Sequence, residues 1–92
     1  MNTEERFVLK QIVGRALDKG YLLSVLDGED VPIQNSDDPE AVMAELGHCD
    51  EEWLQVANAD GKRIGTIYLV YGNDPDEVVA DCTDKPEILE LL

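Results

Sequence analysis

Two short acidic segments hold the side chains best suited to bind a metal ion. Asp27–Asp30 reads D-G-E-D and Asp74–Glu77 reads D-P-D-E, so each offers several carboxylate oxygens at the spacing found in calcium sites. Neither segment matches the twelve-residue calcium loop, which needs a glycine at its sixth position and a distal glutamate. Acidic residues beside glycine or proline are also typical of turns. We therefore interpret both segments as turns and expect no bound metal or cofactor.

The pair His48–Cys49 is the second candidate for chemistry, as a zinc site or as a nucleophile with its base. Adjacent residues seldom converge on one metal ion, and the chain has no second histidine to complete a ligand set. No residue is apparent that would orient the base. We interpret the pair as a histidine at a helix end beside a half-buried, reduced thiol. The sequence also lacks the glycine patterns of hydrolases, P-loops and dinucleotide sites, so we expect a protein that is not an enzyme.

The surplus of acidic residues is the third candidate, and it points to binding. The 92 residues include 21 Asp and Glu against 7 Lys and Arg, which gives a formal net charge of −14. A small domain needs a net charge of only about 2–8 to stay soluble, and a larger charge costs stability through self-repulsion. Proteins that bind nucleic acid or anionic membranes use Lys and Arg, so we exclude both as direct partners. The composition instead favours a basic protein as the partner.

The acidic residues are segregated along the chain. Residues 20–61 contain eleven Asp and Glu and no Lys or Arg, whereas residues 1–19 have a net charge of +1. Neighbouring carboxylates on one face of a strand or helix lie about 6–7 Å apart, and a nucleic-acid strand carries one phosphate per about 3.4 Å. A rigid array of carboxylates could therefore occupy a site built for phosphates. We predict that the partner-binding residues form two clusters, the first being Asp27, Glu29, Asp30, Asp37, Asp38 and Glu40, and the second Asp74, Asp76 and Glu77.

The first half of the chain has clear signals of secondary structure. The pattern predicts a helix capped by Thr3 and stopped at Gly20, with an apolar stripe of Val8, Leu9, Ile12, Val13, Ala16 and Leu17. A strand is predicted over Tyr21–Leu26, with a hairpin partner over Val31–Gln34. Because Pro32 lacks an amide donor, that partner should lie at a sheet edge. A second helix should start at a cap on Asp38 and end at Gly47, burying Ala41, Val42, Ala44 and Leu46.

The second half reads as three strands and a short helix. The strands are predicted over Glu52–Ala57, Arg63–Tyr71 and Glu77–Cys82, with Val78, Ala80 and Cys82 on one side of the last. Thr83 or Asp84 should cap a terminal helix that runs through Leu92. The resulting order, α-β-β-α-β-β-β-α, predicts a single α+β domain over residues 1–92. It would have two layers, a small antiparallel sheet of four to five strands with two or three helices.

Three segments of the chain resemble a known group of proteins. They are residues 20–29, 60–73 and 77–83, and the resemblance extends from about Ala16 to Glu87. In these segments the chain is similar to small acidic accessory proteins of tailed phages and prophages, mostly of unassigned function. Thr66 and Cys82 stand where those proteins carry aromatic residues, and the resemblance implies no catalytic residue. It implies instead a phage-encoded inhibitor of a host defence nuclease that acts in the cytoplasm of the bacterial cell.

Two hypotheses of function follow. In the first, the protein is a non-enzymatic acidic binding protein whose carboxylates mimic nucleic acid and dock on a basic host protein. In the second, it is a small structural or assembly module that forms a homodimer through an apolar strand or helix face. Trp53, Tyr68 and Tyr71 would then anchor the interface, although large aromatic residues also commonly fill a small core. Met1–Arg6 has no signal-peptide pattern and the longest apolar stretch, Ile67–Tyr71, cannot span a bilayer, so we expect a cytoplasmic protein.

Overall fold

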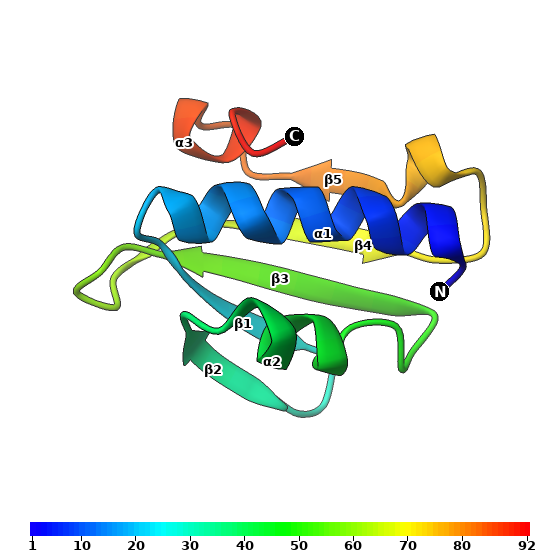
Figure 1. Ribbon diagram of the computed structural model, residues 1–92, viewed down its shortest axis with the longest axis horizontal. Helices are drawn as coiled ribbons and strands as arrows, with labels where there is room; N and C mark the ends of the chain where they lie inside the picture. The colour runs from blue at the N-terminus through cyan, green and yellow to red at the C-terminus, as the bar shows by residue number, and fades with distance from the viewer.

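The computed structural model describes residues 1–92 and contains one five-stranded antiparallel sheet with strand order β2-β1-β3-β4-β5 (Figure 1). The α+β class and the predicted order of elements are confirmed. The elements are α1 (Thr3–Asp18), β1 (Leu22–Leu26), β2 (Ile33–Ser36), α2 (Pro39–Glu45), β3 (Glu51–Ala57), β4 (Arg63–Val70), the 3-10 turn η1 (Pro75–Glu77), β5 (Val79–Cys82) and α3 (Pro86–Leu89).

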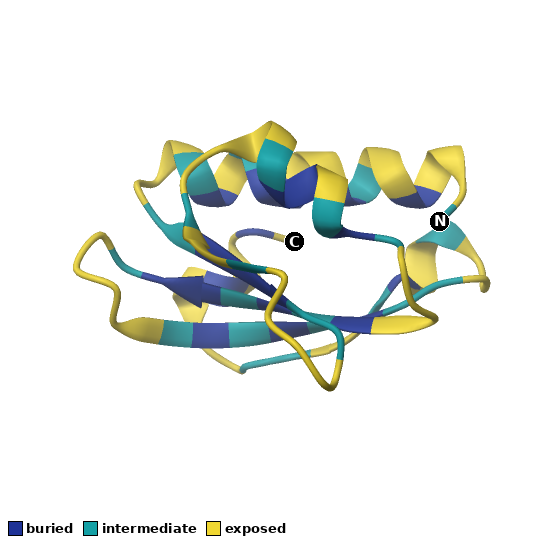
Figure 2. Cartoon of the chain, turned by 90° about the horizontal axis from the view of Figure 1, so that it is seen from below, coloured by how far each residue is buried: buried dark blue, intermediate teal, exposed yellow.

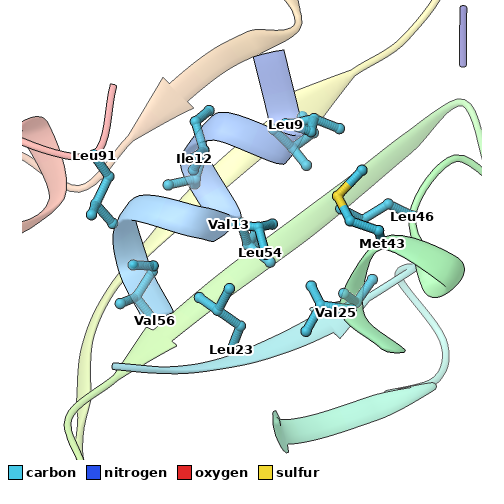
Figure 3. Packing of buried hydrophobic residues seen from close by; sticks show 14 of the residues in the cluster. Leu9, Ile12, Val13, Leu23, Val25, Met43, Leu46, Leu54, Val56 and Leu91 are labelled. Atoms are coloured by element: carbon cyan, nitrogen blue, oxygen red, sulfur yellow. The ribbon is translucent and has the colours of Figure 1, made fainter. Parts of the chain in front are cut away.

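The core lies between the helices and one face of the sheet. Figure 2 shows α1 and α2 on the same side of the strands, and Figure 3 shows buried residues of α1 over β1 and β3. The predicted stripe of α1 is correct, because Leu9, Ile12, Val13 and Ala16 are buried and Val8 and Leu17 pack against them. Ile88 of α3 and Leu91, which follows that helix, belong to the same core. The opposite face of the sheet is consequently left without a helix, and we call it the open face.

The early elements differ from the prediction at two ends and in the buried side of α2. The cap of α1 is Asn2 rather than Thr3, because the Asn2 side chain accepts from the Glu5 amide while the Glu5 carboxylate accepts from the Asn2 amide. Strand β2 starts at Ile33, after a wide turn, and lies at the sheet edge as Pro32 predicts. In α2, Asp38 is the cap as predicted, but Met43 is buried with Val42 and Leu46, and Ala44 is exposed.

The last part of the chain departs further from the predicted pattern. Val79 pairs with Leu69 while Asp81 pairs with Tyr68, so Ala80 is an extra residue in a bulge. Val79 and Cys82 therefore pack against the core and Ala80 is exposed, which makes the predicted side for Ala80 wrong. Neither Thr83 nor Asp84 caps α3, whose N-cap position is Lys85, and the helix ends at Leu89. The Thr83 hydroxyl instead accepts from the Thr66 amide at 3.0 Å.

Candidate functional site

Three loops at one end of the sheet carry an unbalanced negative charge. They are residues 27–32, 46–50 and 71–78, which meet where β1 and β4 end and β3 begins, on the right of Figure 1. The Tyr71 amide donates to the Asp50 carbonyl at 3.0 Å and joins two of the loops. Together they contain no Lys or Arg and seven acidic residues, Asp27, Glu29, Asp30, Asp50, Asp74, Asp76 and Glu77. We call these three loops the acidic end.

The opposite end of the sheet has a nearly balanced charge. Its connecting segments, residues 19–21, 37–38, 58–62 and 83–85, contain four acidic residues and three lysines. The single ion pair of the structure lies here, with Lys19 Nζ 2.9 Å from Glu90 Oε2. We call these four segments the mixed end. The charge segregation seen along the chain is thus also a segregation in space.

The structure separates the first predicted cluster into two halves, and one half lies at the same end of the sheet as the second cluster. Asp37, Asp38 and Glu40 follow β2 and lie at the mixed end, separated from Asp30 by a strand of four residues, about 13 Å. Asp38 also uses its carboxylate to accept from the Glu40 amide at 3.0 Å. Asp27, Glu29 and Asp30 share the acidic end with the second cluster, Asp74, Asp76 and Glu77. The two groups lie in the connections at opposite edges of the sheet, whose centres are three strand spacings, about 14 Å, apart.

The loop between β1 and β2 is held in place by one of its own acidic residues. Asp27 accepts from the Asp30 amide at 2.8 Å and from the Glu29 amide at 3.0 Å, and these bonds hold the pKa of Asp27 below its usual value. Its carboxylate is therefore occupied by the backbone of the loop. Glu29 and Asp30 are exposed and their carboxylates accept no hydrogen bond. These two side chains are free to meet a partner.

His48 and Cys49 belong to the loop between α2 and β3, at the acidic end. His48 Nε2 lies 2.7 Å from the Ala44 carbonyl oxygen, as expected of a histidine at a helix end. Cys49 is exposed rather than half-buried, so that prediction is wrong. Desolvation and then the charges of nearby carboxylates, Asp27 among them, raise the pKa of the Cys49 thiol, which makes it a poor nucleophile. Nowhere in the structure do three His, Cys, Asp or Glu side chains lie close enough to hold a metal ion.

Two buried carboxylates under the acidic end were missed in the sequence. Glu5 and Glu52 are each only 1% exposed. Glu5 accepts from the Gly72 amide at 3.0 Å and so ties α1 to the loop after β4. Glu52 accepts from the Gly47 amide at 2.7 Å, and its second oxygen has no hydrogen-bond partner. A signal was present for Glu52, because strand alternation puts it on the same side as Leu54 and Val56.

The three aromatic residues proposed as interface anchors lie in two different places. Trp53 and Tyr68 are cross-strand neighbours on the open face, stacked with ring centroids 5.2 Å apart. The Tyr68 hydroxyl donates to Glu51, which raises the pKa of Tyr68. Tyr71 instead packs against the core and donates to Glu52 Oε1 at 2.6 Å, and burial raises its pKa far above the usual value. Tyr71 is therefore a packing residue, and only the Trp53–Tyr68 pair is available to a partner.

Comparison with known proteins identifies no relative, because no family model, curated protein or solved structure matches this chain. None of its helices has the length and apolar character needed to cross a membrane.

Proposed function

We propose that the protein is a non-enzymatic binding protein that docks its acidic end on a basic surface of a nucleic-acid-binding protein. One observation carries the proposal. Seven acidic residues of three loops lie at one end of the sheet with no Lys or Arg among them, while the only ion pair lies at the other end. Carboxylates left uncompensated repel one another, and a basic surface would remove that repulsion.

The spacing of the acidic end suits a partner that normally binds phosphates. Its loops extend across five strands, about 19 Å, so that seven carboxylates correspond to roughly one charge per 3 Å. A single nucleic-acid strand carries one phosphate per about 3.4 Å. A groove that binds one strand would therefore meet a similar charge density on the acidic end. An inhibitor of a nuclease, as the resemblance to phage accessory proteins implies, would act in this way by occupying the groove.

A second function, homodimerisation, is favoured by a different observation. Trp53 and Tyr68 stack on the open face, where neither a helix nor a loop covers them fully. A dimer built on this face would bury apolar surface and would be insensitive to salt. Sedimentation at low and high ionic strength tests this alternative, since a dimer that persists at 1 M salt supports assembly and a monomer at both excludes it.

The proposed function is tested by charge reversal at the two ends. The acidic-end variant carries Asp74→Lys, Asp76→Lys and Glu77→Lys, and the control carries Asp37→Lys, Asp60→Lys and Asp84→Lys. All six side chains are exposed and accept no hydrogen bond, and both variants change the net charge equally. Each protein is immobilised and used to capture proteins from a bacterial lysate at 50 mM and 500 mM salt, with and without duplex DNA.

We expect the unmodified protein and the control to retain basic nucleic-acid-binding proteins at low salt. These should be released by high salt and by duplex DNA, because binding is electrostatic and DNA competes for the same groove. The acidic-end variant should retain at least tenfold less. Equal loss in the two variants, or retention that DNA does not affect, would contradict the proposal.

A further inference from the structure

The open face has a hollow where it meets the acidic end. The hollow has a volume of about 460 Å³, and its lining includes Trp53, Leu26 and Val31. Glu29 and Asp30 also line it. It therefore combines an aromatic surface, an aliphatic surface and two carboxylates within one depression.

The loop that carries the carboxylates is in contact with the indole. A Cβ atom placed on Gly28 would lie 3.5 Å from Trp53 Cζ3, so the backbone of the loop lies directly against the ring. The bonds from the Glu29 and Asp30 amides to Asp27 fix the same loop. Glu29 and Asp30 line the hollow together with Trp53, and neither carboxylate is in an ion pair.

No cation of the chain itself fills the hollow. Neither Glu29 nor Asp30 is in an ion pair, since the only one joins Lys19 to Glu90. Arg63 lines a neighbouring hollow and donates at 3.2 Å to Gln55, a residue that lines both hollows. The hollow is therefore negatively charged and lined in part by an aromatic ring, and no Lys or Arg is among its lining residues.

We propose that this hollow binds the side chain of an arginine of the partner protein. The proposal rests on the proposed function and names the recognition element of that interface. A guanidinium is planar, can stack on an indole and can donate to two carboxylates at once, whereas a lysine ammonium is a compact, strongly hydrated charge. The three methylenes of arginine would lie on Leu26 and Val31.

Trp53 makes the hollow directly observable, because it is the only tryptophan of the chain. The probes are hexa-arginine and hexa-lysine peptides of equal charge, titrated into the protein while the fluorescence of Trp53 is recorded. We expect a saturable change with hexa-arginine and an affinity at least fivefold higher than for hexa-lysine. Equal affinities, or no change in Trp53 emission on binding, would overturn the assignment.

Two variants with the same loss of charge locate the binding site. Glu29→Gln with Asp30→Asn removes both carboxylates of the hollow, and Asp74→Asn with Asp76→Asn removes two from the other edge of the acidic end. All four side chains are exposed, so both variants should fold. The first should weaken hexa-arginine binding at least tenfold and the second less than threefold. Equal weakening would mean that attraction is to net charge and not to the hollow.

The two proposals can fail separately. If the hollow variant binds hexa-arginine normally while charge reversal at the acidic end abolishes capture of basic proteins, the arginine site is wrong and the proposed function stands. If hexa-arginine binds the hollow selectively but no basic protein is captured in a DNA-sensitive way, the site exists and the proposed function is wrong.

Discussion

The two ends of the sheet are built on the same strands and yet are held together differently. At the mixed end, Gly65 allows Ile88 of α3 to approach β4, and Lys19 pairs with Glu90. At the acidic end, carboxylates bond mainly to backbone amides, as Asp27 and Glu52 do, or remain unpaired. The mixed end thus gains stability from packing and opposite charges, whereas the acidic end bears uncompensated repulsion. Because the unpaired carboxylates of the acidic end cost stability, we expect them to serve binding.

The largest effect on stability is expected from removing Glu52, the buried carboxylate beneath the acidic end. Glu52→Ala would leave the Gly47 amide and the Tyr71 hydroxyl without their acceptor, and we expect a loss of about 2–3 kcal/mol in the free energy of unfolding. The neighbouring Glu51→Ala is the control, because Glu51 is exposed and its hydrogen bond from Tyr68 lies at the surface, so the substitution should cost less than about 1 kcal/mol. Urea denaturation measures both. Similar losses would mean that the buried carboxylate does not organise this end.

At the mixed end, the largest loss of stability is expected from disturbing the packing of α3 on β4. A Cβ atom on Gly65 would lie 2.7 Å from Ile88 Cγ1 and 2.9 Å from Thr83 Cβ, so Gly65→Ala should destabilise the protein by about 2 kcal/mol. Gly14→Ala is the matched control within α1, where nothing lies within 4 Å. It should instead stabilise by about 0.5–1 kcal/mol, because alanine is the better helix former. The two variants should shift the thermal midpoint in opposite directions, and a shift in the same direction would contradict the packing argument.

Charge reversal should separate the two ends through their dependence on salt. The variant with Asp74→Lys, Asp76→Lys and Glu77→Lys should raise the free energy of unfolding by about 0.5–1 kcal/mol at low salt, because it relieves repulsion. The gain should disappear at 1 M salt, where charges are screened beyond about 3 Å. The mixed-end variant with Asp37→Lys, Asp60→Lys and Asp84→Lys should gain less. Thermal unfolding at both salt concentrations gives the comparison, and equal gains would argue against the segregation of charge.

The smallest effects are expected from the pH dependence of stability, with one titrating group at each end. The pKa of Asp27 is lowered by its bonds to the loop amides. Its contribution to the free energy of unfolding is therefore complete above about pH 4 and is lost as the pH falls through the pKa of the folded state. The pKa of Lys19 is raised by the hydrogen bond to Glu90. Its contribution to the free energy of unfolding is therefore complete below about pH 10 and is lost as the pH rises further.

These two pH effects are measured as thermal midpoints of variants that cannot titrate. Asp27→Asn retains an acceptor for the loop amides, and it should flatten the acid limb of the curve while leaving the alkaline limb unchanged. Lys19→Met should do the reverse. If either substitution altered the limb assigned to the other, the attribution to these groups would be wrong.

Elements with strong local signals were predictable from the sequence, and those set by distant contacts were not. The apolar stripe of α1 and the Asp38 cap of α2 are local and were predicted correctly. The bulge at Ala80 and the start of α3 were not predicted. They depend on the register of β5 against β4 and on the Thr83–Thr66 hydrogen bond, which no short window of sequence reveals.

The predicted strands were enough to show in part which acidic residues share one end of the sheet. The first cluster was expected as one group although its two halves flank the predicted strand that became β2, and the two ends of a strand cannot face the same loop region. The separation of the first cluster into two halves therefore follows from the predicted hairpin of β1 and β2. The approach of Asp74, Asp76 and Glu77 to the same end follows from the antiparallel pairing of β3 with β4. The order of all five strands, which places the two acidic groups at opposite edges, could not be derived.

The central claim is that the acidic end is the docking surface, and the most direct measurement is a map of amide chemical-shift changes by NMR. Hexa-arginine is titrated into isotopically labelled protein at 50 mM salt. We predict that the largest changes fall in residues 27–32 and in Trp53, with smaller changes in residues 46–50 and 71–78 and little change in residues 37–38, 58–62 and 83–85. Changes spread equally over both ends of the sheet would contradict the account.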